Sequence, residues 1–157
     1  MAFDYLEQRR IMGCFATGVT VVTTLENEIP HGMTANAVTS LSLNPPLILI
    51  SVDSKAHMNN YLRTSKIFAV NILTVEHEEL SVRFAQHGPK DFSDIEYRTE
   101  ITGAPIFEKA LAYVDCQITS ILPGGDHDIF IGEILAGGQQ EGKPLIYYGG
   151  QYRRLPD

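Results

Sequence analysis

The chain has 157 residues, 44% of them hydrophobic and 20% charged, which suits one globular domain spanning residues 1–157. The formal net charge of −7 argues against a protein that binds duplex nucleic acid, because no cationic surplus exists to neutralise phosphates. No apolar run has the length of a membrane span, no signal-peptide pattern is present, and Cys14 and Cys116 form no CxxC motif, so we expect reduced thiols in the cytoplasm.

The first third of the chain predicts a helix followed by two antiparallel strands. Apolar side chains recur at helical spacing over residues 2–15. The β-branched segment 19–25 predicts a strand, and the polar turn after it predicts that residues 29–37 return antiparallel.

Two helices and two buried strands are expected in the middle of the chain. The apolar run 46–52 predicts a central strand, and residues 67–73 predict another. Residues 57–64 and 75–87 have the spacing of helices. The Gly-, Pro- and charge-rich segment 88–105 predicts a long loop of the kind that often covers a site.

The last third predicts strands joined by turns. Residues 112–119 alternate between apolar and mostly polar side chains, which places Cys116 in the core. Turns are expected at 123–126 and 137–143, with strands at 128–135 and 145–148. Because strands outnumber helices and short turns join them, we expect a mainly β fold, an antiparallel barrel with peripheral helices. Strand counting alone does not distinguish one kind of small barrel from another.

One ordered series of short motifs resembles a known family. It comprises Thr34-Ala35-Asn36-Ala37, Ser40, Ser42, Pro45-Pro46-Leu47, Ser54-Lys55, Ala69–Leu73, Arg83-Phe84-Ala85 and Gly125-Asp126-His127. Their order and spacing are similar to those of the short-chain flavin reductases, over about residues 15–152. The resemblance implies an FMN-binding split barrel, an antiparallel fold that forms a single flavin-reductase-like domain. It further implies FMN or FAD as flavin, NADH or NADPH as hydride donor, a homodimer, and a monooxygenase that receives reduced flavin.

Residues 34–37 are the candidate contact with the flavin ring. The small side chains of Thr34, Ala35, Asn36 and Ala37 would let a flat ring approach the backbone, whose polar groups would pair with the polar edge of the ring. The structural alternative is a strand end made of small residues.

Ser51, Ser54 and Lys55 are the candidate phosphate site, and Val52 between them is a further candidate for cofactor binding. Hydroxyl groups and one ammonium within five positions suit an anion, with the lysine acting as a point charge. A lysine after a strand is, however, most often only solvated.

Three further residues are candidates by resemblance. Phe84 is implied to lie beside the flavin, although its helical position favours the core, and Tyr152 is implied to lie near the nicotinamide or a subunit interface. His127 is implied to orient the nicotinamide, as a hydrogen-bond donor whose tautomer Asp126 or Asp128 would fix. It is our candidate catalytic residue. The other four histidines, His31, His57, His77 and His87, are predicted to lie on the surface.

The sequence shows no Ser-His-Asp order, no HExxH motif and no metal-ligand spacing, so we expect no metal site. The resemblance to the short-chain flavin reductases implies an NAD(P)H-dependent flavin reductase. Two alternatives are an electron-transfer protein similar to flavoredoxin, which retains its flavin, and a non-enzymatic barrel that binds another phosphate-bearing ligand.

Overall fold

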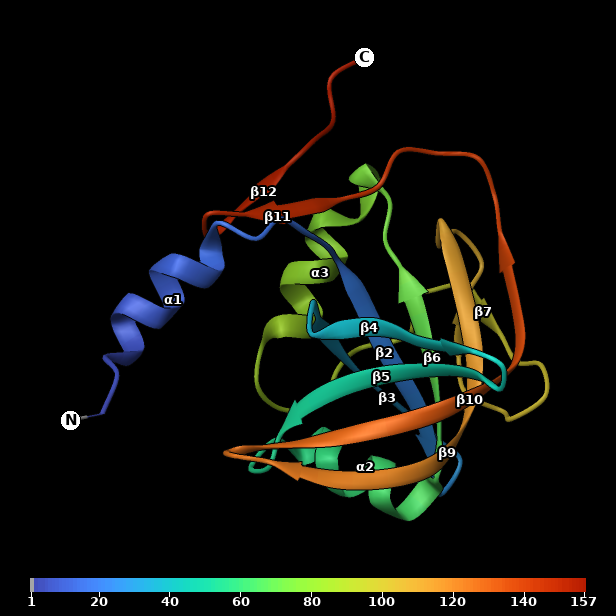
Figure 1. Cartoon of the computed structure of the whole chain (residues 1–157). Helices are drawn as coiled ribbons and strands as arrows, with labels where there is room; N and C mark the ends of the chain where they lie inside the picture. The colour runs from blue at the N-terminus through green and yellow to red at the C-terminus, as the bar shows by residue number, and fades with distance from the viewer. Residues whose placement is uncertain (1) are drawn as a thin grey trace.

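Seven antiparallel strands form one curved sheet in the structure, a computed structural model that describes residues 2–157. Their order across the sheet is β3-β2-β6-β9-β10-β5-β4. Their bounds are Thr20–Glu26 (β2), Ile29–Ala35 (β3), Val38–Leu43 (β4), Pro46–Asp53 (β5), Ile67–Ile72 (β6), Ala112–Gly124 (β9) and His127–Gln139 (β10). β3 and β4 follow one another in the chain yet lie at opposite ends of this order, so the barrel is split where they meet (Figure 1). The expected antiparallel split barrel with peripheral helices is confirmed.

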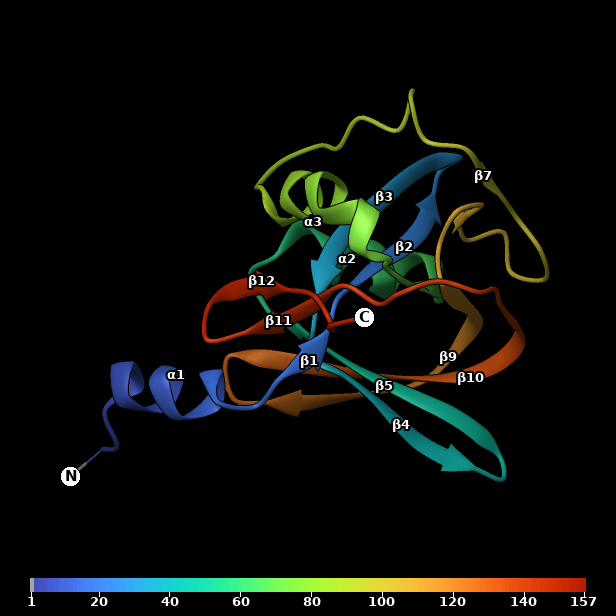
Figure 2. The ribbon, with the colours of Figure 1, turned by 90° about the horizontal axis from the view of Figure 1, so that it is seen from above.

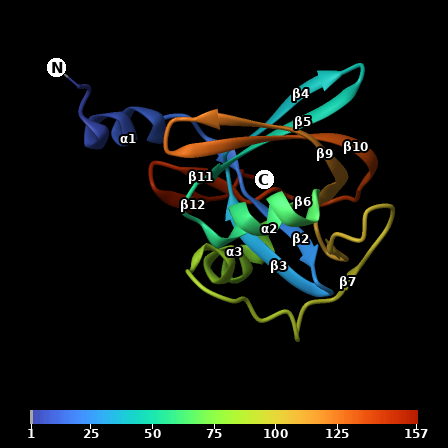
Figure 3. The same ribbon diagram turned by 90° about the horizontal axis from the view of Figure 1, so that it is seen from below.

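Smaller elements surround this sheet. β1 (Thr17–Gly18), β11 (Ile146–Tyr148) and β12 (Gln151–Arg153) form a second sheet, and β7 (Tyr97–Arg98) pairs with β8 (Ile106–Phe107). The helices are α1 (Tyr5–Gly13), α2 (His57–Ser65), the 3-10 turn η1 (Val75–His77) and α3 (Glu78–Ala85). α2 and α3 both pack against β2 and β3 (Figure 3). No helix within residues 2–157 is long and apolar enough to cross a membrane.

Several boundaries differ from those that the sequence predicts. β4 is a strand that the pattern did not reveal, and the expected helix 75–87 is divided into η1 and α3, which ends at Ala85. The run 46–52 is not central, because β5 lies next to the edge strand β4. The turn expected at 137–143 is wrong in its first part, because β10 continues to Gln139.

The C-terminal hairpin is a second element that sequence reasoning missed. Gly149 and Gly150 have φ values of 61° and 75°, the two positive angles that a tight hairpin turn requires. They join β11 to β12 and bring Tyr147 and Tyr152 into contact, with ring centroids 5.5 Å apart. The Gly-Gly pair between aromatic residues was the available signal.

The main core lies between the curved sheet and α2. Phe68, Phe130 and Leu62 are fully buried there together with Cys116. A Cβ atom at Gly132 would lie 2.6 Å from the Phe68 ring and 2.9 Å from Cys116, so this ring fits only against a glycine.

Burial determines the reactivity of the two thiols. It raises the pKa of Cys116 to about 12, whereas Cys14 is exposed at the end of α1. We expect iodoacetamide at pH 8 to alkylate Cys14 in the native protein and to spare Cys116. The reagent cannot reach Cys116, and its raised pKa leaves almost no thiolate at this pH. Mass spectrometry after labelling, with and without guanidinium, measures this. Alkylation of both thiols at similar rates in the native state would contradict the buried position.

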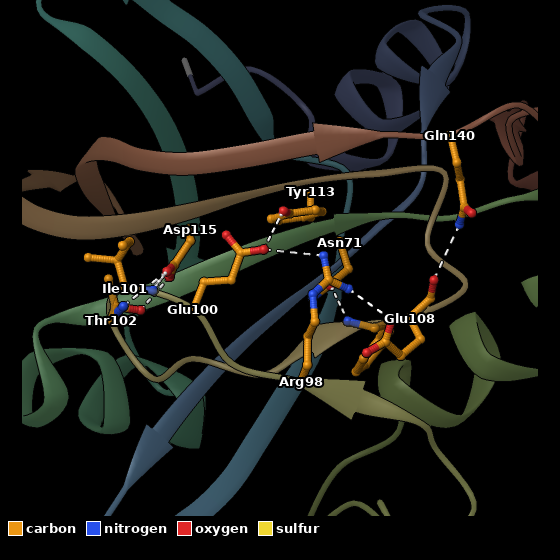
Figure 4. A network of polar contacts seen from close by, with 10 residues as sticks. Asn71, Arg98, Glu100, Ile101, Thr102, Glu108, Tyr113, Asp115 and Gln140 are labelled. Atoms are coloured by element: carbon orange, nitrogen blue, oxygen red, sulfur yellow. Dashed lines mark hydrogen bonds and ion pairs between the residues drawn. The ribbon is translucent and has the colours of Figure 1, made fainter.

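The long segment after α3 is fastened to the body of the protein. Its first part runs along the outside of α3 and β3 (Figure 2). Farther on, the backbone N–H groups of Ile101 and Thr102 donate to the buried carboxylate of Asp115, over 2.9 and 3.0 Å (Figure 4). Arg98 bonds to Glu108 at 3.0 Å beside these contacts. The second half of the predicted loop is therefore an ordered cover over β9.

Candidate functional site

A cavity of about 530 Å³ opens beside the split in the barrel. It is lined by residues 31–34 of β3 together with Asp53, residues 55–58 and Tyr61. Residues 84–90, from the end of α3 and the segment after it, complete the lining. A volume of this size is ordinary for a small-molecule site.

The cavity brings three of the expected flavin-binding residues together. Thr34, Lys55 and Phe84 all line it, although they come from three separate elements. The other expected residues lie outside its lining.

The ring-contact segment lies at the split itself. The Ser51 N–H donates to the Ala37 carbonyl over 3.0 Å, so residues 34–37 and 51–52 are side by side. Ala35 and Val52 are buried, while Asn36 and Ala37 are exposed. Small side chains thus border an exposed backbone connection, as the ring-contact hypothesis requires.

The candidate phosphate site lies where β5 turns into α2. The Lys55 N–H donates to Asp53 Oδ1 over 2.8 Å, and the Ser54 N–H donates to the Asp126 carbonyl over 3.0 Å. No side chain caps α2, and its first turn has no acidic residue. The free N–H groups of a helix N-terminus attract anions, so this corner and Lys55 have the chemistry to hold a phosphate.

Ser81, which sequence reasoning missed, joins two of the expected residues. Its carbonyl accepts from the Thr34 hydroxyl over 2.6 Å, and its own hydroxyl bonds to the Tyr152 hydroxyl at 2.7 Å. Both hydroxyl groups therefore hold α3 to β3 and to the C-terminal hairpin. Because the Thr34 hydroxyl already donates to Ser81, toward a ligand it can act only as an acceptor.

Phe84 belongs to the core and to the cavity wall at once. It is 1% exposed and packs edge-on against Phe92, with centroids 5.2 Å apart. A Cβ atom at Gly32 would lie 2.5 Å from its ring, so a glycine is needed there for the ring to take this position.

His127 lies at the corner between β5 and β10, outside the cavity lining. It faces Asp53 across the ladder, and its Nδ1 is 2.7 Å from Asp126 Oδ1. This contact holds the pKa of Asp126 below its ordinary value. Asp128 instead accepts from Asn59 and Arg63, both at 2.9 Å, so Asp126 is the residue that fixes the tautomer.

That tautomer changes what His127 can do. With the Nδ1 proton donated to Asp126, Nε2 of the neutral ring is an acceptor, and it donates only when the ring is protonated. The donor role expected from the sequence therefore needs the charged ring. The neutral ring suits an amide N–H₂ group instead.

The surface prediction for His31 is wrong. Its ring stacks on Tyr61, with centroids 3.6 Å apart and planes 12° from parallel, and its Nε2 is buried with no hydrogen-bond partner among the described residues. Burial lowers the pKa of His31. His77 is also half-buried, because it forms a capping box with Thr74. His57 and His87 are exposed, as predicted, and both border the cavity.

Within residues 2–157, no three side chains of His, Cys, Asp or Glu are placed to hold a metal ion together. The site offers backbone groups, one helix terminus, two lysines and aromatic rings, which is a set for binding an organic anion.

The sequence of this chain is similar to those of known proteins over nearly its whole length. The family model for the flavin reductase like domain matches residues 12–156. The NADH-dependent FAD reductase of Streptomyces globisporus is 40% identical, over 98% of this chain and 88% of its own. The reductase component of a 4-nitrophenol 4-monooxygenase/4-nitrocatechol 2-monooxygenase from Rhodococcus opacus is 36% identical, over 95% of this chain and 80% of its own.

A solved structure agrees with these matches. The flavin reductase PheA2 superposes with a TM-score of 0.91 at 42% identity, covering 99% of this chain and 100% of its own. With the family model spanning nearly all of the sequence, the chain belongs to the flavin-reductase-like family.

Proposed function

We propose that this protein is an NAD(P)H-dependent flavin reductase, which binds FMN or FAD and reduces it with a hydride from a nicotinamide nucleotide. We also propose that residues 1–157 form one flavin-reductase-like domain. The observation that supports the activity best is the continuity of the site. The exposed connection Asn36-Ala37 is bonded to β5 at Ser51, and four residues farther along the chain Lys55 stands at the uncapped N-terminus of α2, which suits a flavin ring followed by its phosphate.

The phosphate is assigned to the corner between β5 and α2. Lys55 supplies the positive charge, Ser54 a hydroxyl, and the first turn of α2 free N–H groups. Ser51 lies deeper on β5, next to Ala37, and is better placed toward the ribityl chain or the ring.

The ring is assigned to the split between β3 and β4. Its polar edge would be buried unpaired unless backbone groups bonded to it, and the exposed connection Asn36-Ala37 supplies such groups. Val52 is 1% exposed and its side chain belongs to the main core.

Hydride transfer to a flavin needs no nucleophilic side chain. The bound flavin supplies an electron sink for the hydride, so the protein needs to bind, orient and exclude water. This is consistent with a site that has no nucleophile beside a base.

His127→Ala tests the end of the site assigned to the nicotinamide. We expect kcat/KM for NADH to fall roughly three- to thirtyfold, the effect of losing one hydrogen bond, while flavin affinity stays unchanged. Steady-state kinetics and flavin titration measure the two quantities. Asp126→Asn keeps the imidazole but removes the carboxylate that fixes its tautomer, so we expect a smaller fall in kcat/KM for NADH. Normal NADH kinetics with weakened flavin binding would reverse the assignment of the two ends.

We further propose that reduced flavin passes to a monooxygenase component and that the protein acts as a cytoplasmic homodimer. The Rhodococcus opacus relative is named as a monooxygenase reductase component, which supports the first point. α1 supports the second, because it stands away from the sheet and contains no buried residue (Figure 1). Its apolar side chains Leu6, Ile11 and Met12 are at least half exposed, as a surface that a second copy covers would be. Analytical ultracentrifugation tests the dimer.

The central experiment combines an absorbance spectrum with NADH oxidation in the presence of added FMN or FAD. A flavin reductase oxidises NADH only when flavin is supplied or bound. Yellow protein that keeps its flavin through gel filtration and needs no added flavin would favour the flavoredoxin-like alternative. Protein that binds neither flavin and does not oxidise NADH would contradict the proposal.

A further inference from the structure

A network of polar side chains, with Asn59 buried at its centre, joins α2 to the start of β10. Asn59 lies in the first turn of α2 and is 2% exposed. Its Nδ2 donates to Asp128 Oδ2 over 2.9 Å, and its Oδ1 accepts from Arg63 Nε over 2.9 Å. Arg63 also bonds to the same Asp128 oxygen at 2.9 Å. None of these three residues lines the cavity.

The amide of Asn59 fits this network in one orientation only. A flipped amide would place its oxygen against the Asp128 carboxylate and its N–H₂ group against the Arg63 guanidinium, and both pairs repel. In the observed orientation Nδ2 also donates to the Asp53 carbonyl, over 3.3 Å. The side chain of Asn59 therefore bonds at the same time to the end of β5 and to the start of β10.

The two ends of the proposed site meet at this network. Asn59 belongs to the helical turn whose free N–H groups are assigned to the flavin phosphate. Asp128 directly follows His127, which is assigned to the nicotinamide, and His127 pairs with Asp53 at the end of the β5–β10 ladder. The contact between Asn59 and Asp128 thus connects the phosphate end to the nicotinamide end, across 69 positions of sequence.

The backbone ladder does not make this connection. It ends at Asp53, and residues 54–56 separate it from α2. The bonds from Arg63 and Asn59 hold the pKa of Asp128 below its ordinary value, so this side chain stays a carboxylate. A hydrogen bond to a carboxylate is stronger than one between neutral groups. The Asn59–Asp128 bond is therefore suited to fix the first turn of α2 relative to His127.

We propose that Asn59 is a positioning residue for hydride transfer, which holds the phosphate corner and His127 in one fixed arrangement through its bond to Asp128. The inference rests on the proposed function, which assigns the two ends of the site. Because hydride transfer needs both rings in a productive geometry, a displacement of about 1 Å can slow it by up to about a hundredfold. Asn59 lies outside the cavity and acts only through its neighbours.

Asn59→Ala tests the proposal with two separate measurements. Flavin affinity, measured by fluorescence titration, should fall about three- to tenfold, and kcat/KM for NADH at saturating flavin should fall about five- to twentyfold. Lys55→Ala is expected to lower only the first quantity and His127→Ala only the second, so the loss of both marks a connection between the ends. Asn60→Ala, on the exposed face of the same helix, is the matched control and should change neither quantity by more than about twofold.

Variants of Asp128 separate the connection from a general loss of packing. Asp128→Ala removes the acceptor and should lower kcat/KM for NADH by a factor similar to that of Asn59→Ala. The double variant should be at most about twofold slower than the slower single variant, because both changes remove one contact. Asp128→Asn keeps an amide oxygen that can accept from Asn59, so it should recover most of the loss. In a His127→Ala background, Asn59→Ala should lower kcat/KM no further.

Thermal denaturation of the flavin-free variants measures damage to the fold without any activity. Asn59→Ala should lower Tm by roughly 3–8 °C. If this variant does not fold, Arg63→Gln replaces it. Arg63→Gln removes the partner of the Asn59 oxygen at a half-exposed position, and it should lower both quantities about two- to fivefold. No change in either quantity would then overturn the proposal.

The other outcomes decide between a positioning role and simpler ones. A lower Tm with unchanged flavin affinity and unchanged kcat/KM would make Asn59 a purely structural residue and overturn the proposal. A loss of flavin affinity alone would limit Asn59 to the phosphate corner, and additive losses with Asp128→Ala would show two independent effects; each would overturn the connection. All these results leave the reductase function intact, whereas a wild type that binds no flavin would overturn both proposals.

Discussion

Lys55→Ala is expected to weaken flavin binding about tenfold to a hundredfold, because a charged hydrogen bond contributes roughly 1.5–3 kcal/mol. The Lys55 N–H donates to Asp53 Oδ1, and Lys55 lies at the uncapped start of α2, where a phosphate would accept hydrogen bonds from the free N–H groups and from the ammonium. At saturating flavin, kcat should change little, because the ammonium is distant from the atoms that exchange hydride. Flavin titration and steady-state kinetics measure the two effects separately.

Two further variants make this result specific. Lys55→Arg keeps the charge but changes its geometry, so it should be milder than Lys55→Ala yet not silent. Lys109→Ala removes a charge elsewhere and should leave flavin affinity unchanged. Unchanged affinity in Lys55→Ala would mean that the phosphate lies elsewhere.

Asn71→Leu is expected to lower the free energy of unfolding by about 2–4 kcal/mol, which makes it the largest stability effect that we predict. Asn71 is fully buried on β6. Its amide donates to the Val21 carbonyl over 3.1 Å, and its Oδ1 accepts from the Phe107 N–H over 2.8 Å. Leucine fills the same space but leaves both backbone groups buried without this partner.

Thermal or urea denaturation measures the loss, and Asn60→Leu is the matched control. Asn60 lies on the exposed face of α2, so its substitution should change stability by less than about 0.5 kcal/mol. Wild-type stability in Asn71→Leu would show that the bonds to Val21 and Phe107 are not needed to hold β8 on the sheet.

Local pattern was enough to find most of the framework. The alternation in 112–119, the β-branched run 19–25 and the helix 57–64 each appear in the structure, because burying one face imposes a period of two or of about 3.6. The ordered motifs from Thr34 to His127 likewise indicated the family, which the match over residues 12–156 confirms. Cys116 was placed in the core for the same reason, by the side of the strand on which it falls.

Patterns failed where an environment is made by segments far apart in the chain. Asp115 belongs to the alternating polar set, yet it is buried, because Ile101 and Thr102 fold back and donate to it. β4 is an edge strand whose side chains are mostly exposed, Leu41 and Leu43 included, so its apolar residues mark no buried face.

The sequence by itself therefore determined the antiparallel barrel and the family, because these depend on short motifs and on local periodicity. The positions of the ring and phosphate contacts stay predictions. Only the tertiary structure showed which side chains from distant segments contact one another. It stacked His31 on Tyr61 across 30 positions of sequence, tied Thr34 and Tyr152 to Ser81, and extended the phosphate corner into a cavity. Such contacts arise from the packing of helices against a curved sheet, and packing between distant segments leaves no regular signal in a single sequence.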